Sequence, residues 1–115
     1  MKLRSKKNTL QCLRNRKWEN LCSFPDEIER FLLIESGDII VQLIFLENGR
    51  NIYLLSQNGA IKWQIQEQPH KIDLPSPYGC FEYKGGKLTA TTQDSYEYEI
   101  DMSTGKILRT IAFWK

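Results

Sequence analysis

The sequence lacks the residues that metal sites and most catalytic sites need in groups. It has one histidine, His70, and three cysteines with no Cys-x-x-Cys pair among them. Structural metal sites and acid–base pairs require several such side chains close together. We therefore expect no metal site, no cofactor and no catalytic residue. Three thiols cannot all pair with one another, and they are expected to stay reduced, as in a cytoplasmic protein.

Long hydrophobic runs are missing as well. The longest apolar stretch, from Ile39 to Leu46, is interrupted by Gln42. It is far shorter than the roughly 20 residues that a membrane-spanning helix needs. The basic N-terminus is not followed by the apolar run of a signal peptide. These absences predict a cytoplasmic protein without a membrane partner.

Acidic residues are absent from the start of the chain. Residues 1–17 contain seven Lys or Arg and no acid, whereas the rest contains nine basic and fourteen acidic residues. This distribution predicts a basic tail on an acidic body, with residues 1–8 mobile. The length of 115 residues suffices for a single domain with its own core, and residues 1–115 are expected to form one.

The apolar residues from Glu29 onward recur with the period of two that is typical of β-strands. Turn-forming residues divide this region into two sets of four strands: 29–35, 39–46, 51–56 and 60–66, then 80–83, 87–92, 95–101 and 106–113. Residues 67–78 contain three prolines and are expected to link the two sets. The segment 9–23 is ambiguous, because Leu10, Leu13, Lys17 and Leu21 approach helical spacing whereas Leu10, Cys12 and Trp18 could equally lie on a strand. We expect it to be irregular or helical.

Two Asn-Gly pairs, at 48–49 and 58–59, are expected to form tight hairpin turns because Asn and Gly tolerate positive φ. Short connections between consecutive strands favour antiparallel meanders. The sequence therefore predicts an all-β fold, in which two four-stranded antiparallel meanders pack as a sandwich or as a flattened barrel.

One predicted strand, Ser95–Asp101, carries a row of acids. Strict alternation places Tyr98 and Ile100 on the buried face and Glu97, Glu99 and Asp101 on the solvent face. Such a row is either an ordinary solvated face or a docking surface for a basic partner. The second interpretation gives the candidate partner-binding set, to which nearby polar and aromatic residues are added: Glu97, Glu99, Asp101, Asp94, His70 and Tyr78.

Nucleic acid is not expected as a partner. The basic N-terminus with Trp18 offers salt-dependent affinity for phosphates. The acidic body would repel the same phosphates, however, and no set of aromatic residues on a basic sheet is visible in the sequence. His70 lies in the Pro-rich segment without a second His or a Cys pair, and is expected to be an ordinary surface residue.

The segments 51–63 and 96–108 resemble the blades of PQQ-type and WD-type β-propellers. In those families a strand ends in Asp-x-x-Thr-Gly or Asn-Gly, and the next strand opens with Lys-x-Leu or Ile-x-Trp, as residues 101–108 and 58–63 do here. Two blades cannot close into a ring. No counterpart of the calcium and quinone ligands of the PQQ enzymes is present, so the resemblance implies no cofactor.

Residues 50–108 also resemble a group of small bacterial proteins, some of which are immunity partners of secreted toxins such as contact-dependent inhibition toxins. The resemblance is carried by 51–65, by 86–92 and by 98–107, and it departs from the group at Gln93-Asp94-Ser95. It implies a binding role without catalytic residues. We therefore expect a non-enzymatic immunity protein that covers the basic active surface of a secreted toxin, with a nuclease as one candidate for that toxin. The alternative is a propeller-like assembly module that oligomerises through sheet edges, and an enzyme is the third choice.

Overall fold

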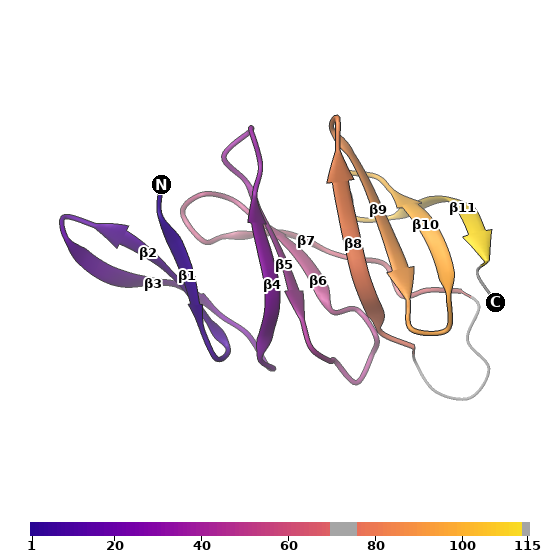
Figure 1. Ribbon diagram of the computed structural model, residues 1–115, viewed down its shortest axis with the longest axis horizontal. Helices are drawn as coiled ribbons and strands as arrows, with labels where there is room; N and C mark the ends of the chain where they lie inside the picture. Colours follow the sequence, from indigo (N-terminus) through magenta and orange to yellow (C-terminus); the bar gives the residue numbers. More distant parts are fainter. Residues whose placement is uncertain (70–75, 114–115) are drawn as a thin grey trace.

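The computed structural model describes residues 1–69 and 76–113, and this part of the chain contains strands and no helix. The strands are β1 (Leu3–Lys6), β2 (Thr9–Arg14), β3 (Lys17–Ser23), β4 (Ile28–Leu33), β5 (Ile39–Leu43), β6 (Ile52–Leu55), β7 (Ile61–Gln64), β8 (Tyr78–Lys84), β9 (Lys87–Thr92), β10 (Tyr96–Ile100) and β11 (Ile107–Phe113). They form three antiparallel sheets: the first sheet (β1–β3), the middle sheet (β4–β7) and the last sheet (β8–β11). Figure 1 shows the three sheets standing in a row along the longest axis. The all-β fold and both four-stranded meanders are confirmed.

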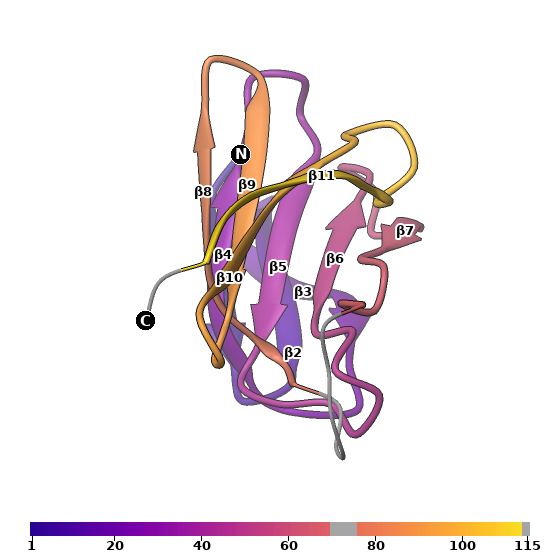
Figure 2. The ribbon, with the colours of Figure 1, turned by 90° about the vertical axis from the view of Figure 1, so that its right-hand side faces the viewer.

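The middle sheet is covered on both faces. Its residues alternate between two cores, with Ile39, Val41 and Leu43 packed toward the first sheet and Ile40 and Leu54 toward the last sheet. In Figure 2, which looks along the row, the strands of the three sheets lie one behind another. The apolar residues of β5 are therefore nearly continuous because both faces of this strand are buried.

The first sheet corrects the prediction for the N-terminal third. Residues 9–23, expected to be irregular or helical, form the hairpin of β2 and β3, and the expected mobile tail contains β1, which pairs with β2. The turns of this sheet place Lys7, Asn15 and Arg16 at φ of 53°, 50° and 65°. Lys and Arg rarely adopt this conformation. Because these turns contain no glycine, their hairpins could not be recognised from the sequence.

Two further expectations need correction. The sheets do not close into a flattened barrel, because each keeps two edge strands, and neighbouring sheets pack face to face instead. The Asn48-Gly49 turn exists, with the Gly49 N–H donating to the Leu46 carbonyl at 2.9 Å, but it lies within a longer connection that runs from residue 44 to 51. The Asn58-Gly59 turn is tight as predicted, with the Gly59 N–H bonded to the Ser56 carbonyl at 3.0 Å.

Buried amides fasten the last sheet to the middle sheet. Asn51 is fully buried, and its side chain bonds both the N–H and the carbonyl of Tyr78 at 2.8 Å. Gln42, on β5, donates to the Gly79 carbonyl at 3.0 Å. These bonds fix where β8 begins after the Pro-rich connection. Within residues 1–69 and 76–113, no helix is long and apolar enough to cross a membrane.

Candidate functional site

In the acidic row of β10, Glu99 is paired with cations on the two neighbouring strands. Glu97 and Glu99 lie on the outer face of the last sheet and are only partly exposed. One Glu99 carboxylate oxygen accepts a hydrogen bond from Arg109 Nε on β11 at 2.8 Å and lies 3.7 Å from Lys87 Nζ on β9. Opposite charges that meet across strands stabilise a sheet. Glu99 therefore stabilises the pairing of β10 with its neighbours, and it does not present an uncompensated charge to a partner.

Asp101 and Asp94 belong to turns. Asp101 Oδ1 accepts a hydrogen bond from the Ser103 N–H at 2.8 Å, and its carbonyl accepts from the Gly105 N–H at 2.8 Å. Asp94 Oδ1 accepts from the hydroxyls of Thr92 at 2.5 Å and Ser76 at 3.1 Å. An Asp side chain that bonds its own turn in this way fixes the turn conformation. Neither carboxylate extends the acidic row of β10.

The remaining predicted residues do not join this group. Tyr78 is fully buried between the sheets, where its hydroxyl donates to the Gln66 carbonyl at 2.7 Å and burial raises its pKa. It is a core residue and cannot reach a partner. His70 lies outside the described residues. The structure thus brings Glu97 and Glu99 together and separates them from the other candidates.

Two hollows open between the middle and the last sheet. The larger, about 520 Å³, is lined by Arg50, Gln64, Gln66, Glu67, Thr104, Gly105 and Lys106. The Arg50 guanidinium is already bonded to the carbonyls of Ile65 at 2.9 Å and Gln64 at 3.3 Å. This arginine holds the end of the middle sheet in place.

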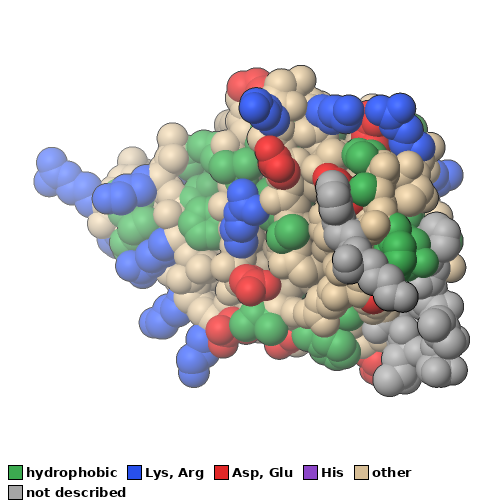
Figure 3. All heavy atoms as spheres, turned by 45° about the vertical axis from the view of Figure 1, so that its right-hand side comes forward, with side chains coloured by type: hydrophobic (Ala, Val, Ile, Leu, Met, Phe, Trp, Pro, Cys, Tyr) green, Lys and Arg blue, Asp and Glu red, His purple; other side chains and the backbone are tan. Residues whose placement is uncertain are grey.

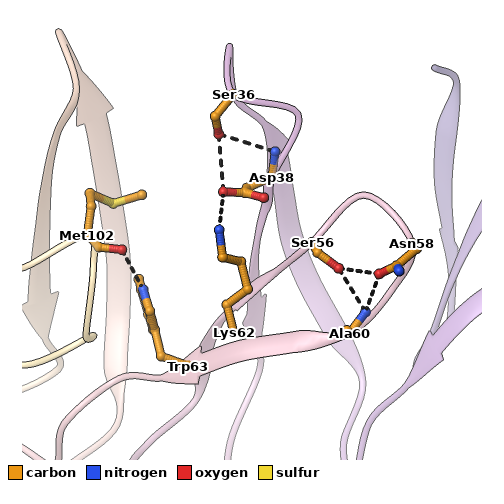
Figure 4. A network of polar contacts seen from close by, with 8 residues as sticks. All are labelled: Ser36, Asp38, Ser56, Asn58, Ala60, Lys62, Trp63 and Met102. Atoms are coloured by element: carbon orange, nitrogen blue, oxygen red, sulfur yellow. Dashed lines mark hydrogen bonds and ion pairs between the residues drawn. The ribbon is translucent and has the colours of Figure 1, made fainter.

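The second hollow is lined by residues of both sheets, and Figure 4 shows polar contacts made by several of them, among them Ser36, Asp38 and Lys62. Lys62 on β7 reaches across the sheet to Asp38 in the β4–β5 turn, with Nζ 3.0 Å from Oδ2. Trp63 Nε1 donates to the Met102 carbonyl at 2.8 Å and so joins the middle sheet to the last. Across residues 1–69 and 76–113, no three His, Cys, Asp or Glu side chains are grouped so that they could hold a metal ion.

A carboxylate and a phenol meet at the rim of this second hollow. The Tyr83 hydroxyl, on β8, donates to Glu35 Oε1 at 2.6 Å. This hydrogen bond lowers the pKa of Glu35 and raises the pKa of Tyr83, because it stabilises the ionised carboxylate and the protonated phenol. A lowered carboxyl pKa gives a contribution to stability that is present above the ordinary pKa of an unfolded Glu and is lost as the pH falls through the lowered value.

We expect the Tyr83→Phe variant to raise the pKa of Glu35 toward the ordinary value of a glutamate, because the only group removed is the hydroxyl that bonds its carboxylate. NMR titration of the Glu35 side-chain carboxyl carbon measures this pKa directly. Tyr53→Phe, which removes a hydroxyl bonded to Gln64, is the matched control and should leave the Glu35 pKa unchanged. An unchanged Glu35 pKa in Tyr83→Phe would show that the bond is not formed in solution.

The edge strand β11 exposes apolar residues that the sequence analysis did not select. Leu108, Ile111 and Phe113 are 57%, 42% and 50% exposed, and β11 pairs with β10 on one side only. The pairing of β10 with β11 is irregular at two places, between Glu97 and Tyr98 and between Glu99 and Ile100. Bulges of this kind re-aim side chains out of the alternating pattern. The sequence carried a signal of this exposure. Most residues of β11 are apolar, whereas strict alternation between a buried and a solvent-facing side would have made about half of them polar.

Comparisons with known proteins concern the fold and the family. A solved structure of the computationally designed Ika8 protein resembles this chain with a TM-score of 0.62 at 11% sequence identity. The match covers 95% of this chain and 35% of that chain, so this chain spans about a third of the designed protein's length. A search of curated proteins finds no match. The model of a family described as a domain of unknown function (DUF7957) matches residues 13–112.

Proposed function

This chain belongs to the DUF7957 family, a domain of unknown function, and we propose that it is a non-enzymatic protein that binds another protein along β11. The observation that carries the proposal is the exposure of Leu108, Ile111 and Phe113 on a strand that pairs only with β10 among residues 1–69 and 76–113. Removing apolar surface from water contributes about 25 cal/mol per Å² to association. An unpaired strand edge adds backbone hydrogen bonds to a partner strand.

The charge of the surrounding sheets favours a basic partner. Residues 24–69 and 76–113 contain seven Lys or Arg and twelve Asp or Glu, a net charge of −5. A negative body attracts a positive surface over distance and speeds association, an effect that salt weakens. Contact with the partner would come from β11, while the acidic body would guide the approach.

The narrower form of the proposal is a cytoplasmic immunity protein whose partner is a toxin with a basic active-site surface. Its support is the resemblance of residues 50–108 to immunity proteins, together with the acidic body. The cytoplasmic location is supported by three cysteines that form no disulfide, one of them, Cys80, exposed. An exposed free thiol is compatible with a reducing compartment.

We expect the double variant Leu108→Ser, Ile111→Ser to lose at least about tenfold in toxin neutralisation, equivalent to about 1.4 kcal/mol of binding. The measurement is growth of cells that express the chain together with a toxic domain encoded beside its gene. Leu33→Ser with Ile61→Ser is the matched control, because these residues are 38% and 53% exposed on the middle sheet, away from β11. Equal protection by both double variants would exclude β11 as the binding edge.

The rival function, an assembly module, uses the same strand. Two copies could pair their β11 edges as antiparallel strands and bury the same apolar residues. Light scattering after size exclusion distinguishes the two functions. A monomer mass supports binding of a different protein, whereas a dimer that Leu108→Ser, Ile111→Ser returns to monomer would replace the immunity hypothesis by self-assembly.

A further inference from the structure

The outer face of the first sheet carries a ladder of polar side chains that crosses all three strands. Arg4, Gln11 and Asn20 are direct cross-strand neighbours on β1, β2 and β3. Arg4 Nε donates to Gln11 Oε1 at 2.8 Å, and Gln11 Nε2 donates to Asn20 Oδ1 at 2.8 Å. The bonds hold three long polar side chains in one arrangement on a solvent-facing surface.

An aromatic ring supports the first member of this ladder. The Arg4 guanidinium lies over the Trp18 ring, with its central carbon 4.1 Å from the ring centroid. A guanidinium stacks on an aromatic face through its flat, delocalised cation. Because Arg4 is exposed, the side of its guanidinium that faces away from the indole is open to solvent. Side chains fixed in this way lose little conformational entropy when they bind a ligand.

The rest of the first sheet is strongly basic. Residues 1–23 contain seven Lys or Arg and one acid, Glu19, which lies 3.9 Å from Arg14. Lys6 and Lys7 lie at the β1–β2 turn, and the cluster Arg14, Arg16 and Lys17 lies at the β2–β3 turn, at the opposite end of β2. A strand as long as β2 spans about 20 Å. Figure 3 shows Lys and Arg side chains standing out around the end of the molecule that the first sheet occupies.

We propose that this face is a binding platform for single-stranded nucleic acid. Single strands are bound where stacking groups lie within a positively charged surface. Here a base would stack on the Arg4–Trp18 pair, the amides of Gln11 and Asn20 would bond its edge, and the cations of the two turns would contact phosphates on either side. Stacking on an exposed ring pair and bonding of a base edge both need a base that is not stacked and paired in a duplex, so unpaired bases are the ligand that fits.

Two structural observations weaken the reasons that argued against nucleic acid in the sequence. The basic residues form a sheet with an aromatic residue on its outer face, and are not a mobile tail. The acidic sheets stand behind that face, about 10 Å and about 20 Å away at ordinary sheet spacing. Charges are screened over about 8 Å at physiological salt. This site lies at the opposite end of the row from β11, and it does not depend on the function proposed for that strand (Figure 1).

The test measures binding of the full chain to a short fluorescent oligothymidine by anisotropy over a range of salt concentrations. With about four phosphates contacted, the logarithm of the association constant should fall with a slope of about −3 against the logarithm of salt concentration. Arg4→Lys keeps the charge and removes the flat guanidinium, and Trp18→Leu removes the ring. Each should weaken binding about tenfold. Lys84→Ala, which removes one exposed cation from the last sheet, is the matched control and should leave affinity within about twofold.

Thermal unfolding of each variant establishes that the sheet is intact before affinities are compared. Absence of oligothymidine binding by the unaltered chain at low salt would overturn the proposal. Equal affinity of Arg4→Lys, Trp18→Leu and the unaltered chain would overturn the proposal too, because binding would then depend on charge alone and not on stacking. Tighter binding to a DNA duplex, to polyglutamate or to vesicles of anionic lipid than to oligothymidine would assign the face to that other class of partner.

Discussion

The Asn51→Ala variant is expected to lose about 3–5 kcal/mol of unfolding free energy, because it leaves several buried backbone groups without a hydrogen-bond partner. Asn51 Nδ2 donates to the carbonyls of Leu43 at 2.9 Å and Tyr78 at 2.8 Å, and Oδ1 accepts from the Tyr78 N–H at 2.8 Å. The side chain is fully buried. A buried polar group without a hydrogen-bond partner destabilises the folded state by the full free energy of removing it from water.

Denaturant unfolding measures this loss of unfolding free energy, and two further variants test its cause. Asn51→Asp keeps the acceptor for the Tyr78 N–H but places a carboxylate against two carbonyls, so it should be at least as destabilising. Asn48→Ala, which removes an exposed side chain that accepts one hydrogen bond from the Arg50 N–H, should cost about 1 kcal/mol. A loss below about 1 kcal/mol for Asn51→Ala would mean that β8 is not fastened through this residue.

The second large effect is expected for Gly105→Ala. A Cβ atom added at Gly105 would lie 2.6 Å from Cε3 of Trp63, well inside van der Waals contact, and the residue has a φ of 76°. The positive φ costs an alanine about 1 kcal/mol. The overlap with a buried indole adds about 1–3 kcal/mol, because the ring is held by its bond to the Met102 carbonyl and cannot move freely.

Gly86→Ala separates these two contributions. Gly86 has a φ of 79°, almost the same as Gly105, yet an added Cβ would meet nothing within 4 Å. Gly86→Ala should therefore show the conformational cost alone, and the difference between the two variants reports the contact with Trp63. Unfolding free energies that are equal for the two variants would show that the turn at Gly105 does not press on the ring.

A turn glycine approaches the preceding sheet at two places in the row of three sheets. Gly105, in the β10–β11 turn, approaches Trp63 on β7, and Gly59, in the β6–β7 turn, approaches the Leu21 carbonyl on β3. In each case the turn before a sheet's final strand packs on the final strand of the preceding sheet. Gly59 ends the Asn-Gly turn and Gly105 ends the Asp-x-x-Thr-Gly turn of the two segments that resemble propeller blades. The repeat visible in the sequence thus corresponds to a repeated junction between sheets.

The eight strands of the middle and last sheets could be predicted from the sequence alone. Alternating apolar residues correctly assigned Tyr98 and Ile100 to the core. This succeeds because alternation is a local property of a strand, and a buried face selects apolar side chains at every second position. The same reasoning failed for the first sheet, where non-glycine residues take positive φ in the turns. At the β1–β2 turn the Lys7 carbonyl accepts a hydrogen bond from the Ile28 N–H at 2.8 Å, a tertiary contact that local periodicity does not predict.

The tertiary structure alone decided what the surfaces present. Glu99 is neutralised because the register places Arg109 and Lys87 on the strands beside it, and register with its bulges depends on partners distant in the sequence. Leu108 and Ile111 are exposed because β11 is an edge strand, which depends on the order of strands in the sheet. Arg4 meets Trp18 because three strands pair across two turns. Local periodicity determines which residues share a face, and long-range pairing determines what each face contacts.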